Sequence, residues 1–188
     1  NAYWYRIPAK CPHPPHICSI PTAIGPIGVR CIDVSAFENR PATMTKRIHV
    51  SVPASSANLG CGFDTYALAL ELRDSYLFEP ASHDAIEANG KFKNHVPRDV
   101  FRNLAFRAFR TLAPTTAGPN LLKATRHIPP QGGLGGSAGA IVGGLVAANI
   151  AFQLGHDTQE LLWKAAELEG HADNVAAALL GQLVVNVR

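Results

Sequence analysis

A glycine-rich turn that runs directly into an apolar helix is the strongest constraint on how this chain folds. Residues 129–139 read Pro-Pro-Gln-Gly-Gly-Leu-Gly-Gly-Ser-Ala-Gly, and the Ala, Gly and Val residues that follow predict a helix from Ser137 to about Phe152. Glycine lets the backbone adopt positive φ angles and approach a ligand closely. The first N–H groups of a helix are unpaired and lie at the positive end of its dipole, which favours a phosphate. A flexible linker would not continue into so apolar a helix, so the turn predicts a phosphate-binding loop.

Two better-known phosphate loops fit this turn less well. A Walker loop needs a lysine directly after its last glycine, and the sequence has no lysine between Lys123 and Lys164. The dinucleotide fingerprint does match from Gly133 to Ala138, and Asp157 lies near the distance expected for its acidic residue. That fingerprint must follow a strand, however, and the two adjacent prolines ahead of the glycines cannot donate to a sheet ladder. The dinucleotide interpretation therefore remains only a weak alternative.

Two further blocks of sequence, taken together with the glycine turn, resemble one family of small-molecule kinases. An alternating strand pattern over 47–53 leads into a polar, glycine-containing loop, and an apolar strand pattern follows over 64–72. The order and rough spacing of the three blocks resemble those of the GHMP kinases, and closely those of the homoserine kinases among them. The resemblance extends from about Thr45 to the last residue. The matching blocks are Pro53 to Asp64, Pro129 to Ala138 and Glu169 to Val175.

The resemblance implies an α+β fold like that of ribosomal protein S5 domain 2, with a mixed, mostly antiparallel sheet packed against helices. It also implies an ATP-dependent kinase that phosphorylates L-homoserine to O-phospho-L-homoserine in threonine biosynthesis, with Mg²⁺ as the metal. Its partners would be homoserine and ATP, and a homodimer is compatible with the family. Two alternatives stay open: a GHMP kinase with another acceptor, such as a mevalonate kinase, and a non-catalytic nucleotide-binding module.

The same resemblance implies the catalytic residues Ser137, Glu169 and Asn174. Ser137 and Glu169 would share the Mg²⁺, with Glu167 as an alternative ligand; Mg²⁺ keeps waters and phosphates, so one hydroxyl and one carboxylate suffice. Asn174 stands near the position where related kinases use an Asp base. ATP would lie on the loop and first helical turn formed by Pro129, Pro130, Gln131, Gly132, Gly133, Leu134, Gly135, Gly136, Ser137, Ala138 and Gly139.

Homoserine would be bound by residues that match the family's substrate positions. An acid suits the ammonium group and an amide suits the hydroxyl, although Asn and Asp are also ordinary turn residues. The implied homoserine-binding residues are Asn58, Asp64, His171 and Asp173. The main departure from the family is Gly136, where a serine is usual. Gly136→Ser should be tolerated for that reason, and the missing hydroxyl is the only hint of a non-catalytic module.

Periodic patterns predict the remaining elements. An apolar stripe of spacing i, i+3, i+4 predicts one amphipathic helix whose buried residues begin with Phe101. The run from Asp157 to Glu160 has the spacing of a capping box, and Gly170 would close the helix that it opens. Asp173 or Asn174 would cap the last helix. The expected helices are 100–112, 137–152, 157–168 and 175–180, and the expected strands are 47–53, 64–72, 75–80, 84–88 and 183–187.

The composition fits a globular domain and argues against two classes of partner. A hydrophobic content of 47% with 16% charged residues can build a core. No apolar run reaches the roughly 18 residues that a membrane span needs. A net charge of +3 is too small to indicate a nucleic-acid partner. The four cysteines form no paired framework, which favours a reducing, cytoplasmic location.

The two ends of the chain differ from its middle. Residues 1–43 carry half of the 14 prolines and no periodic apolar pattern, so we expect a non-native or disordered extension ahead of Met44. Residues 44–188 would form the N-terminal, ATP-binding domain of the kinase. The family has a second half beyond the strand at 183–187, so the chain is expected to be a fragment with little activity alone and with that strand left as an unpaired edge.

Overall fold

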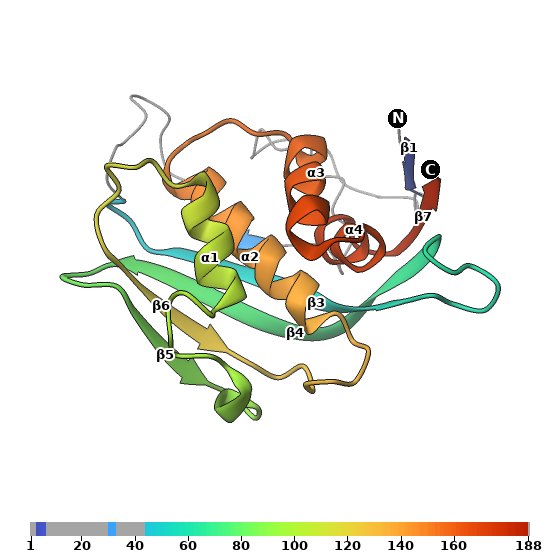
Figure 1. Cartoon of the computed structure of the whole chain (residues 1–188), viewed down its shortest axis with the longest axis horizontal. Coiled ribbons are helices and arrows are strands. Elements are labelled where there is room, and N and C mark those ends of the chain that lie inside the picture. The colour runs from blue at the N-terminus through green and yellow to red at the C-terminus, as the bar shows by residue number, and fades with distance from the viewer. Residues whose placement is uncertain (1–2, 7–29, 33–43, 188) are drawn as a thin grey trace.

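A twisted sheet covered on one face by helices forms the structure (Figure 1). The computed structural model describes residues 3–6, 30–32 and 44–187. A long antiparallel hairpin of β3 and β4 lies at the centre of the sheet, and β6 and β7 both pair antiparallel with β4. The strands are β1 (Tyr3–Arg6), β2 (Arg30–Ile32), β3 (Ile48–Ala57), β4 (Tyr66–Pro80), β5 (Ala85–Asn89), β6 (Asn120–Thr125) and β7 (Leu183–Val187).

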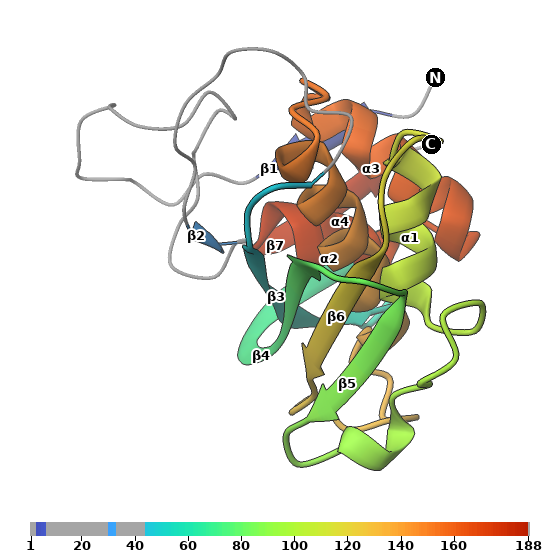
Figure 2. The same cartoon turned by 90° about the vertical axis from the view of Figure 1, so that its left-hand side faces the viewer.

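The α-helices pack against the sheet and against one another, as Figures 1 and 2 show from two sides. Helix α2 is apolar on all sides, which is typical of a helix buried in a core, and it packs against both α1 and β3. The ring of Phe109 on α1 stacks on the ring of Phe78 on β4, with centroids 4.3 Å apart. No helix in the described part of the chain is both long and apolar enough to cross a membrane. The helices are the short 3₁₀ turn η1 (Lys93–His95), α1 (Leu104–Leu112), α2 (Gly136–Ala151), α3 (Thr158–Glu169) and α4 (Asp173–Leu180).

The predicted α+β fold with a mixed, mostly antiparallel sheet is confirmed. Among the described strands, β5 and β6 form the one parallel pair. The two strands expected at 64–72 and 75–80 are a single strand, β4. A charged residue, Asp74, lies at the junction, but its carboxylate accepts hydrogen bonds from the backbone N–H groups of His127 and Ile128. Because the charge finds partners within the fold, the strand continues through it.

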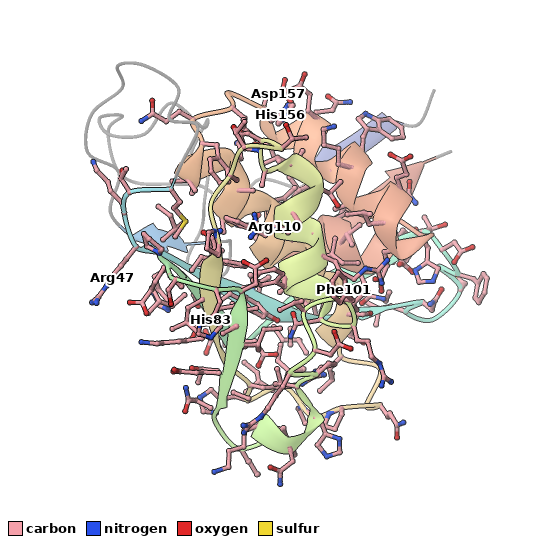
Figure 3. All side chains as sticks on the ribbon, turned by 60° about the vertical axis from the view of Figure 1, so that its left-hand side comes forward. Arg47, His83, Phe101, Arg110, His156 and Asp157 are labelled. Carbon is pink, nitrogen blue, oxygen red and sulfur yellow. The ribbon has the colours of Figure 1, made fainter. Side chains whose placement is uncertain are left out.

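Helix α1 begins four residues later than the apolar stripe predicted, and the prediction that Phe101 is buried was wrong. Its side chain is 83% exposed and lies just ahead of the first turn of α1 (Figure 3). The Asn103 side chain accepts a hydrogen bond from Phe106 N at 3.1 Å and so caps the helix at Leu104. Phe101 belongs instead to a turn in which its own N–H donates to Asp99. It therefore never joins the helical stripe.

The two C-terminal helices give one confirmed and one wrong prediction. The capping box of α3 is present, with both Asp157 and Glu160 making their reciprocal hydrogen bonds, and Gly170 ends the helix at φ 92°. Asp157 lies at the start of α3 in Figure 3. The predicted cap of α4 was wrong, because Asp173 is the first residue of the helix and Ala172 occupies the N-cap without a side-chain hydrogen bond.

The N-terminal extension lies mostly outside the described residues, so its predicted lack of native structure stays a prediction. Two described segments within it form strands that their sequence did not predict. β1 pairs with β7, and β2 pairs with β3. Strand β7 therefore lies between β4 and β1, and the expectation that it is an unpaired edge was wrong. Strand β6 was not predicted either, although its residues alternate between buried and half-buried positions.

Candidate functional site

The glycine loop that joins β6 to α2 ends in a helix start with free donors. Its backbone turns through three positive φ angles, at Gln131 (58°), Gly133 (64°) and Gly135 (64°). Gly135 is the N-cap of α2, and no side chain caps this helix. The N–H of the fourth helical residue, Gly139, donates to the Gly135 carbonyl at 2.8 Å. The three N–H groups ahead of it have no acceptor among the described residues, so they are available to an anion.

Ser55, on β3, fixes this loop to the rest of the domain, and sequence reasoning did not single it out. Its N–H donates to the Leu134 carbonyl at 3.1 Å, and its hydroxyl donates to Asn174 Oδ1 at 2.9 Å. A Cβ on Gly135 would lie only 2.0 Å from the Ser55 hydroxyl oxygen and 3.1 Å from Asn174 Oδ1. The loop, the strand and the start of α4 therefore meet in a contact that only glycine at 135 can make.

The first turn of α2 also meets the end of α3. Ser137 Oγ donates to Glu169 Oε1 at 2.5 Å, although the two residues lie 32 positions apart. Glu169 is the last residue of α3, and Gly170 turns the chain away behind it. Glu167, two residues earlier, is exposed, and its side chain makes no hydrogen bond or ion pair within the described residues. A hydroxyl and a carboxylate thus converge beside the free donors, as two oxygen ligands would.

The four residues matched to homoserine binding fall into two separate groups. Asn58 and Asp64 lie in the β3–β4 hairpin loop, where both adopt positive φ and Asn58 Oδ1 accepts from Asp64 N at 2.8 Å. His171 lies in the turn between α3 and α4 and Asp173 is the first residue of α4, with the His171 ring nitrogen Nδ1 3.9 Å from Asp173 Oδ1. Asp173 is buried and accepts from Asn174 N at 2.6 Å. Across the described residues no hydrogen bond or ion pair joins the two groups.

A cavity of about 220 Å³ opens beside the N-terminus of α2. Its lining combines apolar groups, such as Tyr76 and Val96, with the polar side chains of Arg126 and Ser137. The same cavity is bordered by the loop that follows η1 and by the start of α1. A hollow lined by both apolar and polar side chains, next to free anion donors, can accept a small molecule.

Asp74 is a second functional candidate that sequence reasoning missed, and it supports the base of the glycine loop. Its Oδ1 accepts from His127 N at 2.6 Å and from Ile128 N at 2.8 Å, while its side chain is buried on β4. Burial raises the pKa of the Asp74 carboxyl above the usual range of an aspartate. The two backbone hydrogen bonds and the positive charge of Arg126 oppose this rise without cancelling it.

This raised pKa predicts a pH dependence of stability. The folded state holds the Asp74 proton more tightly than the unfolded chain, in which the pKa of an aspartate is about 3.9. The protonated Asp74 carboxyl therefore contributes fully to the free energy of unfolding below that pH, and this contribution is lost as the pH rises through the folded-state pKa. Asp74→Asn keeps an oxygen acceptor for His127 and Ile128 but does not titrate. Urea unfolding of both proteins should show the wild type losing free energy of unfolding relative to the variant as pH rises from 4. A difference that stays constant with pH would contradict this prediction.

Comparison with known proteins places these features in one family. A family model described as the GHMP kinases N terminal domain matches residues 103–182, which include the glycine loop, Ser137, Glu169 and the whole of α4. Residues 103–182 are a GHMP kinase N-terminal domain. The fold of the chain is that of the GHMP kinase N-terminal domain, as the resemblance implied.

Curated relatives of this chain include two bacterial homoserine kinases. The protein from Symbiobacterium thermophilum is 44% identical over 149 residues, which are 74% of this chain and 46% of that protein. The protein from Lactiplantibacillus plantarum is 45% identical over 137 residues, which are 72% of this chain and 46% of that protein. The solved homoserine kinase of Cytophaga hutchinsonii has a TM-score of 0.65 at 27% identity and matches 81% of this chain and 50% of that one. This chain thus spans about half the length of the relatives that it matches.

Proposed function

We propose that this chain is the nucleotide-binding part of a homoserine kinase, which transfers a phosphoryl group from ATP to the hydroxyl of L-homoserine. The observation that carries the proposal is the uncapped start of α2 with the Ser137–Glu169 pair beside it. Phosphoryl transfer needs a held triphosphate, a divalent metal on its oxygens and an acceptor in line. The identity of 44% and 45% to two homoserine kinases supports homoserine as that acceptor.

The triphosphate would lie on residues 129–139, with the nucleoside in the adjoining cavity of about 220 Å³. The free N–H groups of α2 supply fixed donors and the positive end of the helix dipole, so binding costs little reorganisation. Ser55 holds the loop in this shape before any ligand arrives. Preorganised donors of this kind stabilise the charge that develops during transfer.

Ser137 and Glu169 would hold the Mg²⁺, whose charge neutralises the phosphate oxygens when it is bound. Their donor set fits, since Mg²⁺ takes one or two protein oxygens and completes its shell with phosphates and water. The two side chains already lie 2.5 Å apart at the phosphate end of the site. Glu167 makes a poorer ligand because it is exposed and lies two residues away on α3.

The acceptor would bind between the hairpin loop that carries Asn58 and Asp64 and the junction of α3 and α4 that carries His171 and Asp173. Asn174 would act by position, since an amide cannot take up the hydroxyl proton and its Oδ1 already accepts from Ser55. Positioning and electrostatic stabilisation would then supply the rate. A homodimer and a cytoplasmic location are compatible with this proposal and stay predictions.

Two other functions are separated from this one by a single assay. Mevalonate kinases share the fold, as the Methanococcus jannaschii enzyme does with a TM-score of 0.56 at 15% identity. We expect the complete gene product to release ADP with homoserine and to remain near background with mevalonate or galactose. Turnover with mevalonate would show that the phosphoryl acceptor is mevalonate and not homoserine. ATP binding without turnover on any of the three would identify a non-catalytic nucleotide-binding module.

A further inference from the structure

The side chain of Arg126 fills the space that Gly136 leaves empty. A Cβ built on Gly136 would lie 2.6 Å from Arg126 Nη2 and 3.6 Å from Arg126 Cζ. Arg126 follows β6 at the entrance to the glycine loop, and Gly136 is the first residue of α2. The absence of a side chain at 136 therefore admits a guanidinium group to the first turn of this helix.

The donors of this guanidinium are not used up by the protein. Arg126 Nε donates to the Ile128 carbonyl at 3.3 Å, which leaves the two terminal nitrogens without an acceptor among the described residues. The nearby Asp74 carboxylate forms no ion pair with Arg126 within the part of the chain that the structure describes; its Oδ1 instead accepts from two backbone N–H groups. Arg126 and Ser137 line the same cavity. A half-buried positive charge with free donors thus lies beside the uncapped start of α2.

We propose that Arg126 binds a phosphate group of the nucleotide in place of a side chain at position 136. The proposal rests on the proposed function, because it assumes that ATP lies on the glycine loop. A guanidinium offers a planar pair of N–H donors that matches two phosphate oxygens, and it keeps its charge at any physiological pH. Residues 126 and 136 are then a coupled pair: glycine at 136 makes room for the arginine, and a larger residue there removes it.

Arg126→Ala tests the contact by titration calorimetry of the chain with Mg²⁺-ATP. We expect at least a tenfold loss of affinity, a typical effect of losing a charge-assisted hydrogen bond. The affinity should also fall less steeply with salt than in the wild type, because one screened attraction is gone. Arg126→Lys should recover part of both effects. Arg107→Ala is the matched control, since Arg107 is exposed on α1 away from the cavity, and it should bind ATP like the wild type.

Gly136→Ser tests the exchange between the two positions. The added Cβ must push the guanidinium aside, so we expect Gly136→Ser to bind ATP more weakly than the wild type. The variant should still unfold cooperatively on heating. This expectation differs from the family resemblance, which predicted that Gly136→Ser is tolerated. In the Gly136→Ser background, Arg126→Ala should change affinity less than about threefold, because the contact is already lost. This double variant also removes the close approach and should fold even if Gly136→Ser does not.

The outcomes separate this inference from the function on which it rests. If the wild-type chain does not bind ATP, the proposed function is wrong. A wild type that binds ATP while Arg126→Ala equals Arg107→Ala would overturn the role of Arg126 alone. If Arg126→Ala binds ATP more weakly than the wild type but with the same salt dependence, the role of Arg126 is purely structural. If the effects of Arg126→Ala and Gly136→Ser on ATP affinity are additive, the two positions are not coupled.

Discussion

Glu169→Gln in the complete gene product is expected to lower kcat with homoserine by about 10²–10³, the usual effect of losing one well-placed charge contact in a transition state. The metal stabilises charge chiefly during transfer, so the KM for homoserine should change little. Glutamine keeps an oxygen that can accept from Ser137, so the local structure survives while the negative charge is lost. Ser137→Ala should act in the same direction. Steady-state kinetics with varied homoserine and Mg²⁺ measure both effects.

Glu167→Gln is the matched control for this assignment, since it removes the same charge two residues earlier on α3. Glu167 is exposed and has no described partner, and its substitution should leave kcat within about twofold, as is usual for a surface change away from the site. If Glu167→Gln abolished activity and Glu169→Gln did not, the metal ligand would be the other glutamate. If neither mattered, Mg²⁺ would not bind at the end of α3.

Gly135→Ala is expected to prevent nucleotide binding and to destabilise the whole domain. A non-glycine residue at φ 64° is in the left-handed region, which costs about 1–2 kcal/mol. The new Cβ would also lie 2.0 Å from the Ser55 hydroxyl oxygen, and overpacking of this kind costs about 1–3 kcal/mol more. Together these losses are a large part of the roughly 5–15 kcal/mol that stabilises an ordinary domain. Urea unfolding and ATP titration measure the two consequences.

Gly133→Ala separates the cost of a positive φ angle from the cost of the steric clash with Ser55. Gly133 has the same φ of 64°, but a Cβ there would meet nothing within 4 Å. It should therefore show only the backbone cost and keep most of its ATP affinity. Adding Ser55→Ala to Gly135→Ala removes the atom that collides and should restore part of the stability. Equal losses at 133 and 135 would mean that the contact with Ser55 does not matter.

Patterns that depend on neighbours in sequence predicted much of this fold. The helix after the glycine turn, the capping box of α3 and the strand at 183–187 were each found where a local signal placed them. The family resemblance identified Ser137 and Glu169 as a pair, and they are in contact. Phe101 was misplaced because a single cap, at Asn103, outweighs an apolar stripe at the end of a helix.

The features that were not predicted depend on contacts between segments far apart in the sequence, and hydrophobic periodicity carries no information about such contacts. Ser55 reads as one serine in a polar run, and only the fold brings it to Asn174. Asp74 reads as a strand breaker until its two backbone donors arrive from a loop more than 50 residues later. Gly136 reads as a defect in a familiar loop, whereas the structure shows a neighbouring arginine in the space that it leaves.

The contact between Ser55 and Asn174 spans 119 residues of chain, which determines when the proposed nucleotide site can form during synthesis. A growing polypeptide must extend beyond α4 and clear the ribosome before the glycine loop gains its second anchor. Closing so long a loop costs entropy that only the completed core repays, so the site should form late and with the whole domain. Shorter nascent chains would carry every glycine of the loop and still bind no nucleotide. If ATP binds at the proposed site, it would therefore stabilise this domain only after the domain has folded, and it would not guide the earlier steps.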